Sequence, residues 1–366
     1  MIRTDNPLGI IAGNVAAGGV TVWYGEPGIG KTALMGQIAQ ALGMEFISLS
    51  CALLNYLDLE GFPLQDKTSQ GESIITRHWE GVWKEVTQAE GPATLFLLDE
   101  ITRVPSAQAR NALLRVIQER IVGSAPIRSN VAIVATANPV GSDQGVADLG
   151  SALGNRVMHL EGDPSVEDWH QWMRKQSHEH ALVSAFLTVE TSLVHQFPKQ
   201  QKDRSGAWPS RRSWDNVGKA AASMKKLGLA PSQWVAGYVG EGAARSFAEW
   251  IAKLDIPSPD LILADPLRIA VPPRIDMLVA CLAGLVRATR SRFTKQAYDA
   301  CAKYMERVLQ GNPDVAVEYI TALHEAVDAK AGKIQPVGYV SPPALMLARR
   351  EQNLMLDKIK TALSKK

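Results

Sequence analysis

A glycine-rich stretch near the N-terminus has the residue types and the spacing that bind phosphate groups. It runs through Gly25, Glu26, Pro27, Gly28, Ile29, Gly30, Lys31, Thr32 and Ala33. In a loop of this spacing the backbone N–H groups surround phosphates, the lysine binds the β- and γ-phosphate oxygens, and the hydroxyl reaches Mg²⁺. The stretch therefore predicts that the chain binds a nucleoside triphosphate with Mg²⁺, and that Thr32 is a metal ligand.

An acidic pair, Asp99 and Glu100, follows a continuous apolar run over residues 94–98. Such a run is typical of a parallel strand buried on both faces, and ligands bind beyond the carboxyl ends of these strands. An aspartate there can hold the Mg²⁺ water shell, and the neighbouring glutamate can polarise an attacking water. We expect Asp99 to organise the metal and Glu100 to be the catalytic base.

Asn138 ends a third strand-like run, over residues 131–137, and Pro139 stops that strand from continuing. A carboxamide at this place has the reach to contact both the γ-phosphate and the attacking water. An Asn-Pro pair is also a plain turn signal, and the two interpretations are compatible. Asn138 is therefore a catalytic candidate.

The elements around the glycine loop fit the arrangement that the loop requires. Residues 19–25 form a short β-rich run that ends in glycine, and Leu34, Met35, Ile38 and Leu42 share one face of a helix. In the order strand, loop, helix, the helix N-terminus points at the phosphates. The pattern indicates an α/β fold built on a parallel sheet.

Composition is that of an ordinary globular protein. The 366 residues are 46% hydrophobic and 21% charged, enough for two or three domains. A formal net charge of +2 creates no global field toward nucleic acid or anionic lipid. Cys51, Cys281 and Cys301 are widely spaced and odd in number, which suits a reducing cytosol better than a disulfide framework.

Neither of the two longest apolar stretches indicates a membrane span. Residues 7–20 run directly into the glycine loop, so a signal-peptide cleavage would cut into the catalytic region. Residues 275–286 are too few to cross a bilayer and are bounded by Arg274 and Arg287. We expect a soluble cytoplasmic protein without a membrane partner.

Together these motifs resemble an AAA+ ATPase, and specifically the MoxR branch, in its phage and bacterial subset. The loop has the Gly-x-Pro-Gly-x-Gly-Lys-Thr form of that class. The other similar segments are 56–63, 99–120, 135–139, 149–160, 166–173 and 209–214. Val157 replaces the phenylalanine usual in that branch. The similarity covers about residues 5–255 and is weak beyond about 260.

The resemblance implies a fold and a division into domains. The fold is an AAA+ phosphate-loop domain, with a parallel sheet and helices on both faces, followed by a small helical lid and extra C-terminal helices. The expected domains are the nucleotide-binding domain at 1–160, the lid at 161–255 and a helical extension at 256–366. ATP with Mg²⁺ is the implied cofactor. The guanine signature Asn/Thr-Lys-x-Asp is absent from the sequence, which favours ATP over GTP.

Two arginines receive roles from the resemblance alone. Arg156 matches the arginine finger that reaches the nucleotide of a neighbouring subunit, and a surface arginine that caps a helix end is the alternative. Arg212 matches the sensor-2 arginine of the lid, with the adjacent Arg211 as the alternative. A finger acting on a neighbour implies a ring, usually a hexamer.

The lid and the tail carry structural patterns more than chemical ones. Trp169, Trp172 and Met173 fall on one helical face and are expected to be core. The histidines at 170, 178 and 180 lack metal-ligand spacing. The proline-rich residues 254–274 resemble a linker.

The tail is expected to be helical at 275–290, 295–310 and 314–332, with an amphipathic end at 344–366. It forms either a bundle on the lid or a docking surface for a partner protein.

These expectations add up to a chaperone-like ATPase that remodels a protein. MoxR-like ATPases commonly act with a partner that carries a von Willebrand A domain. Two insertions, at 61–81 and 119–130, are candidates to contact the client at a ring pore, and packing on a neighbouring subunit is the alternative. A nucleic-acid motor of the translocase or helicase-loader type is less favoured, because the charge is near neutral and a DNA-binding module is not recognisable. A slow nucleotide switch or assembly scaffold is the non-enzyme alternative.

Overall fold

The computed structural model describes residues 2–3, 7–67, 69–139, 154–291 and 294–331. Contacts within the chain divide it into two compact units, one ending at Ser165 and the other beginning at Val166. Both the helices expected to form a lid and the helices beyond residue 256 lie in the second unit. The amphipathic segment expected at 344–366 lies outside the described residues.

A six-stranded parallel sheet forms the centre of the first unit, in the order β1-β10-β2-β9-β6-β3. Its strands are β1 (Ile2–Arg3), β2 (Thr21–Tyr24), β3 (Glu45–Ser50), β6 (Thr94–Asp99), β9 (Val131–Ala137) and β10 (Met158–Glu161). The three strands expected from apolar runs, β2, β6 and β9, are neighbours in this sheet. Their carboxyl ends therefore lie side by side at one edge.

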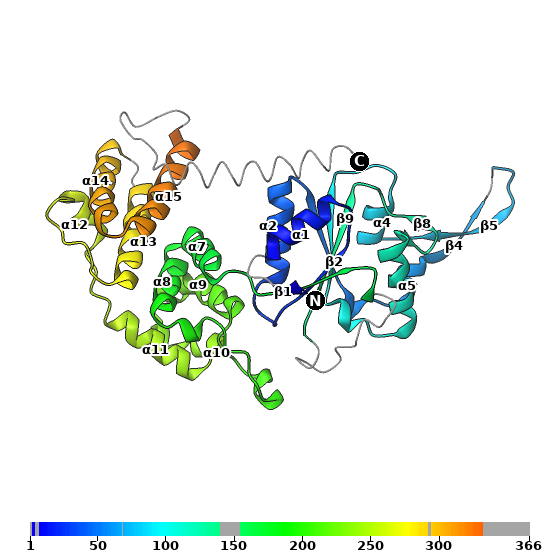
Figure 1. Ribbon diagram of the computed structural model, residues 1–366, viewed down its shortest axis with the longest axis horizontal. Helices are drawn as coiled ribbons and strands as arrows, with labels where there is room; N and C mark the ends of the chain where they lie inside the picture. Colours follow the sequence, from blue (N-terminus) through cyan, green and yellow to red (C-terminus); the bar gives the residue numbers. More distant parts are fainter. Residues whose placement is uncertain (1, 4–6, 68, 140–153, 292–293, 332–366) are drawn as a thin grey trace. The chain divides into compact units, whose positions relative to one another are not determined.

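Helices cover both faces of the sheet, as expected from the sequence (Figure 1). They are α1 (Pro7–Ala16), α2 (Lys31–Leu42), η1 (Cys51–Leu53), α3 (Tyr56–Glu60), α4 (Val82–Thr87), η2 (Ile101–Arg103) and α5 (Ala107–Gln118). Side chains alternate along each buried strand. In β6, Leu95 and Leu97 pack with α1 and α2, whereas Phe96 and Leu98 pack with α4 and α5. This alternation explains why the strand is apolar at every position.

Two small hairpins interrupt this α/β pattern. The short one joins β7 (Ile121–Val122) to β8 (Ala125–Pro126) and lies within the insertion at 119–130. The long one pairs β4 (Phe62–Lys67) with β5 (Ser73–His78) and projects from the first unit (Figure 1). The first arm has no strand signal in the sequence, because Pro63, Gln65 and Asp66 have low strand propensity.

The second unit begins with a cluster of helices around an aromatic core. Its helices are α7 (Val166–Gln176), α8 (His178–Val189), η3 (Thr191–Leu193), η4 (Gln201–Ser205), α9 (Arg211–Lys226), η5 (Pro231–Gln233), α10 (Ala236–Val239) and α11 (Glu241–Ala252). Met173 is fully buried in this core, and Trp169 and Trp172 pack against it, as expected. Trp214 and Phe247 are also buried there and contact each other edge to face.

A second core of this unit is formed by α12 (Pro259–Ala264), α13 (Ile275–Ser291), α14 (Lys295–Gly311) and α15 (Pro313–Ala331). The linker interpretation of residues 254–274 is wrong in part. Pro259 occupies the start of α12, where its missing N–H costs nothing, and Ile262 is buried against α13. Prolines thus mark a helix start there, and the segment packs as part of the core.

Cys51, Cys281 and Cys301 are buried free thiols. Burial raises the pKa of the Cys301 thiol to about 12, so it remains protonated. None of the helices in the described part of the chain combines the length and the apolar content that crossing a bilayer requires.

A buried carboxylate joins the two cores of the second unit and gives a stability prediction. Asp276 is fully buried and accepts hydrogen bonds from Trp250 Nε1 (2.7 Å) and from Arg274 Nε (3.2 Å) and Nη2 (2.6 Å). Burial alone raises the pKa of this carboxyl, but hydrogen bonds from Trp250 and Arg274 lower it below its usual value. This stabilisation is present above about pH 4 and is lost as the pH falls through the lowered pKa.

We therefore expect Asp276→Asn to destabilise the protein by about 1–3 kcal/mol at neutral pH, because a charged acceptor for Arg274 is lost. Thermal unfolding of the full chain, followed by tryptophan fluorescence, measures the effect. The matched control is Asp265→Asn, since Asp265 and its partner Arg268 are both exposed. Equal melting temperatures for the two variants would mean that the buried carboxylate contributes nothing.

Candidate functional site

The glycine loop between β2 and α2 has the backbone that an anion site needs. Gly28 and Gly30 have φ angles of 84° and 95°, in the left-handed region that favours glycine. The Gly25 N–H donates to the Ala137 carbonyl (3.2 Å), which ties the loop to the end of β9. The N-cap residue of α2 is Gly30, which has no side chain to cap the helix. The first N–H groups of α2 can therefore bind phosphate, so the loop fits a nucleotide.

Lys31 connects the loop to the neighbouring strand. Its ammonium donates to the carbonyl oxygens of Gly25 (2.7 Å) and Glu26 (3.1 Å) and to Asn138 Oδ1 (2.9 Å). Lys31 and Asn138 are both buried polar residues. The two residues that the sequence assigns to the γ-phosphate are thus in direct contact, although 107 positions separate them.

Asp99 lies between two hydroxyl groups at the end of β6. Thr32 donates a hydrogen bond to Oδ2 (2.8 Å), and Thr136 of β9 donates one to Oδ1. A carboxylate beside a hydroxyl from the start of α2 is the oxygen ligand set that Mg²⁺ prefers. Thr32 and Asp99 therefore fit the expected metal.

Glu100 has a left-handed backbone, with φ at 56°, which is uncommon for a residue other than glycine. Its N–H donates to Thr136 Oγ1 (3.3 Å), and Arg103 Nη1 lies 3.4 Å from its Oε2. The side chain is one-third exposed, so water can reach it. Such backbone strain concentrates at functional sites, which agrees with a base held in one place.

Three residues that surround this acidic pair belong to no sequence motif. Thr136 binds both Asp99 and Glu100, and its side chain is fully buried. Its only sequence signal is a polar residue in the apolar run of β9. Arg103 lies one turn after Glu100. Burial, and then the charges of Asp99 and Glu100, raise the pKa of Cys51 to about 12. The thiol therefore remains neutral beneath the carboxylates.

Arg156 lies away from these groups. Met158 of β10 pairs with Thr21, the first residue of β2, whereas the glycine loop follows the last residue of β2. Arg156 precedes β10 by two residues and is exposed, so it lies at the amino-end edge of the sheet, opposite the loop. It is not brought together with Lys31 or Asp99.

Arg212 belongs to the second unit. It is exposed in the first turn of α9, where Ser210 caps the helix by accepting a hydrogen bond from the Ser213 N–H. The adjacent Arg211 is buried. The two arginines therefore differ in exposure, and Arg212 is the one open to a ligand.

Residues 21–144 match the profile of the AAA family, the ATPase family associated with various cellular activities. The match begins at β2 and includes the glycine loop, the acidic pair and Asn138. It covers about one-third of the chain. A comparison with curated proteins finds no match to this chain.

Solved structures similar to this chain include a protein from Cytophaga hutchinsonii that is described as a candidate ATPase. The identity is 16% over 96% of this chain and 88% of that one, with a TM-score of 0.32. NtrX from Brucella abortus is 18% identical over 88% of this chain and 67% of its own, with a TM-score of 0.35. Scores this low carry no argument, so the family match alone bears on function.

Proposed function

We propose that this chain is an ATP hydrolase that uses Mg-ATP hydrolysis to remodel a partner protein as a MoxR-like ring. The match of residues 21–144 to the AAA family supports the ATPase activity. The ring is a hexamer in this proposal. Its domains are the nucleotide-binding domain at 1–160, a lid at 161–255 and an extension at 256–366. The resemblance to MoxR proteins supports a partner with a von Willebrand A domain.

The observation that carries the proposal is the convergence of groups from three neighbouring strands. Lys31 follows β2, Asn138 follows β9, and Asp99 ends β6, and hydrogen bonds connect Lys31 to Asn138 and Thr32 to Asp99. Lys31 binds the β- and γ-phosphate oxygens, and Asn138 orients the γ-phosphate and the water. Thr32 and Asp99 hold Mg²⁺, which neutralises phosphate charge when bound.

Glu100 completes the hydrolytic role in the same subunit. Its carboxylate accepts a proton from the attacking water, and Thr136 holds its backbone beside Asp99. Arg103 Nη1 lies 3.4 Å from the carboxylate, which restricts the orientation of the Glu100 side chain. The proposed base, Glu100, is thus the residue next to the proposed metal ligand, Asp99.

The place of Arg156 supports a ring. An exposed arginine at the amino-end edge of the sheet lies opposite the glycine loop of its own subunit. From there it is open to a neighbouring subunit, whose γ-phosphate it would stabilise during transfer. Arg212 would contribute from the lid as the sensor-2 residue.

The β4–β5 hairpin supports a protein client. Leu64 and Ile75 are 51% and 76% exposed on a two-stranded sheet that projects from the first unit (Figure 1). Exposed apolar side chains on a projecting element are typical of a protein-binding surface. We assign client contact to this hairpin, with the β7–β8 hairpin as the second contact element.

The test is capture of the client by a hydrolysis-deficient variant. Glu100→Gln, loaded with ATP, is expected to retain a bound protein that a pull-down from the native host recovers. In the same background, Ile75→Ser is expected to abolish the capture, because the most exposed apolar group of the hairpin is removed. The matched control is Leu267→Ser, which changes an apolar side chain that is 64% exposed in the second unit.

Three results would contradict the proposal. Recovery of nuclease-sensitive nucleic acid in place of protein would favour the motor alternative. Equal capture with ATP and ADP would show that client binding is not coupled to ATP hydrolysis. Equal loss of capture in Ile75→Ser and Leu267→Ser would show that the hairpin does not contact the client specifically.

A further inference from the structure

The turn that carries Arg156 is closed by a hydrogen bond from the His159 ring. His159 Nε2 lies 3.0 Å from the carbonyl oxygen of Gly154. Because a carbonyl oxygen can only accept, Nε2 carries the hydrogen and donates it. Arg156 stands between these two residues in the sequence and is exposed. The ring therefore ties together the two ends of a short segment that has the arginine in its middle.

Tyr24 holds the same ring from its other side. With the hydrogen on Nε2, the Nδ1 atom of a neutral ring accepts, and the Tyr24 hydroxyl lies 3.1 Å from it as the donor. The two rings also stack, with their centroids 5.8 Å apart and their planes 20° from parallel. Tyr24 is buried in the core of the first unit. Rotation of the His159 ring would break these contacts, so its orientation is fixed.

The sheet holds the backbone on the other side of Arg156. The Met158 N–H donates to the Val20 carbonyl (2.9 Å), and Val157 packs against the core. The backbone after Arg156 is thus held by β10, and the backbone before it is held at Gly154 by the His159 ring.

Tyr24 also precedes the glycine loop, so the His159 ring could act on the nucleotide site of its own subunit instead. The contacts favour the Arg156 side. Gly25 is already tied to the Ala137 carbonyl (3.2 Å), and its own carbonyl accepts from Lys31 (2.7 Å). The bond from His159 to Gly154, by contrast, closes the arginine turn directly.

We propose that His159 is a positioning residue for Arg156, with Tyr24 as its support. The inference rests on the proposed ring, in which Arg156 reaches the nucleotide of a neighbouring subunit. A group that stabilises a transferring phosphoryl must be placed accurately, and a displacement of about 1 Å can cost about 10²-fold in rate. The His159 ring provides this accuracy, because it fixes the backbone from which the long arginine side chain extends.

Three substitutions grade the loss of these contacts. His159→Ala removes both hydrogen bonds and the stacking, and it is expected to lower ATP turnover about 10–100-fold at an unchanged KM. His159→Gln retains a side-chain N–H that can donate to the Gly154 oxygen, so most of the turnover should return. Tyr24→Phe removes only the donor to Nδ1 and should have an intermediate effect. Steady-state phosphate release at varied ATP measures all three.

Mixed rings show on which side of the subunit interface His159 acts. A His159→Ala subunit has an intact phosphate loop and a misplaced finger, so mixing it with Lys31→Ala should restore up to about one quarter of the wild-type rate. Mixing it with Arg156→Ala should restore nothing, because both subunits lack a working finger. The reverse pattern would place the defect at the subunit's own loop and overturn the proposal, and so would rescue by neither partner.

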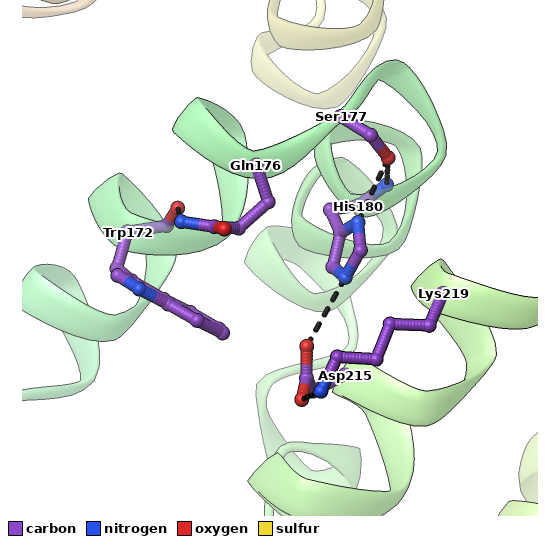
Figure 2. A network of polar contacts seen from close by, with 6 residues as sticks. All are labelled: Trp172, Gln176, Ser177, His180, Asp215 and Lys219. Carbon is purple, nitrogen blue, oxygen red and sulfur yellow. Dashed lines mark hydrogen bonds and ion pairs between the residues drawn. The ribbon is translucent and has the colours of Figure 1, made fainter. Parts of the chain in front are cut away.

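Hydrogen exchange in the absence of nucleotide tests the turn without relying on a ring. Exchange at residues 154–158 is expected to be faster in His159→Ala than in the wild type. The matched control is His180→Ala in the second unit, because both nitrogens of this ring also have partners (Figure 2). Nδ1 lies 2.8 Å from Ser177 Oγ, and Nε2 lies 3.1 Å from Asp215, which also binds Lys219. His180→Ala should leave exchange at 154–158 unchanged.

Arg156→Ala, measured alongside, separates this inference from the proposed ring. Wild-type turnover in Arg156→Ala would contradict the ring itself. Low turnover in Arg156→Ala together with wild-type turnover in His159→Ala would overturn the role of His159 while the ring stands. Unchanged exchange at residues 154–158 in His159→Ala would also overturn it, because the turn would then not depend on the ring of His159.

Discussion

Glu100→Gln is expected to bind ATP with nearly unchanged affinity and to hydrolyse it about 10²–10⁴-fold more slowly. The substitution keeps the size of the side chain but removes the carboxylate that accepts the proton of the attacking water. Phosphate binding should persist, because Lys31 and the first N–H groups of α2 are not altered. The contacts of Asp99 with Thr32 and Thr136 also remain, so the metal ligands are preserved.

Nucleotide titration and steady-state phosphate release, measured on the same preparation, separate binding from turnover. Lys31→Ala is expected to lose affinity for ATP, because the charge that binds the phosphate oxygens is missing. Glu90→Gln is the matched control, because Glu90 is an exposed glutamate outside the site. Hydrolysis by Glu100→Gln at the rate of Glu90→Gln would show that the base has been assigned to the wrong residue.

The nucleotide core could be predicted from the sequence because each of its parts has a local signal. A glycine loop, an apolar run followed by two carboxylates and an Asn-Pro pair each span fewer than ten residues. The parallel sheet then brings them to one edge without further information. The family match over residues 21–144 agrees with this core.

Features that depend on contacts between distant residues could not be predicted. Thr136 is one polar residue in an apolar strand, and only the pairing of β9 with β6 places it beside Asp99. The Arg174–Glu318 pair joins residues 144 positions apart and leaves no local pattern. The α12 helix was hidden because prolines signal both a linker and a helix start.

The exposure of Arg156 at the edge opposite its own glycine loop leads to the second large effect. Arg156→Ala is expected to bind ATP normally and to lose about 10³–10⁵-fold in turnover, the range that arginine fingers contribute in other NTPases. A guanidinium stabilises charge that spreads over the transferred phosphoryl group, and it adds little to ground-state binding. Arg245→Ala, an exposed arginine on α11, is the matched control and should retain its activity.

If Arg156 acts on the nucleotide of a neighbouring subunit, two inactive variants should recover ATPase activity when they are mixed. Arg156→Ala subunits keep an intact phosphate loop, and Lys31→Ala subunits keep an intact finger. When the two are mixed equally, about one quarter of the interfaces in a ring join an intact loop to an intact finger. Neither variant alone contains such an interface.

The measurement that tests the ring ATPase most directly is steady-state ATP hydrolysis by this mixture, with light scattering on the same sample. We predict a ring-sized particle and a rate far above that of either variant alone, up to about one quarter of the wild-type rate. A monomer at every ATP concentration, with Arg156→Ala as active as Arg245→Ala, would contradict the account and favour a slow nucleotide switch.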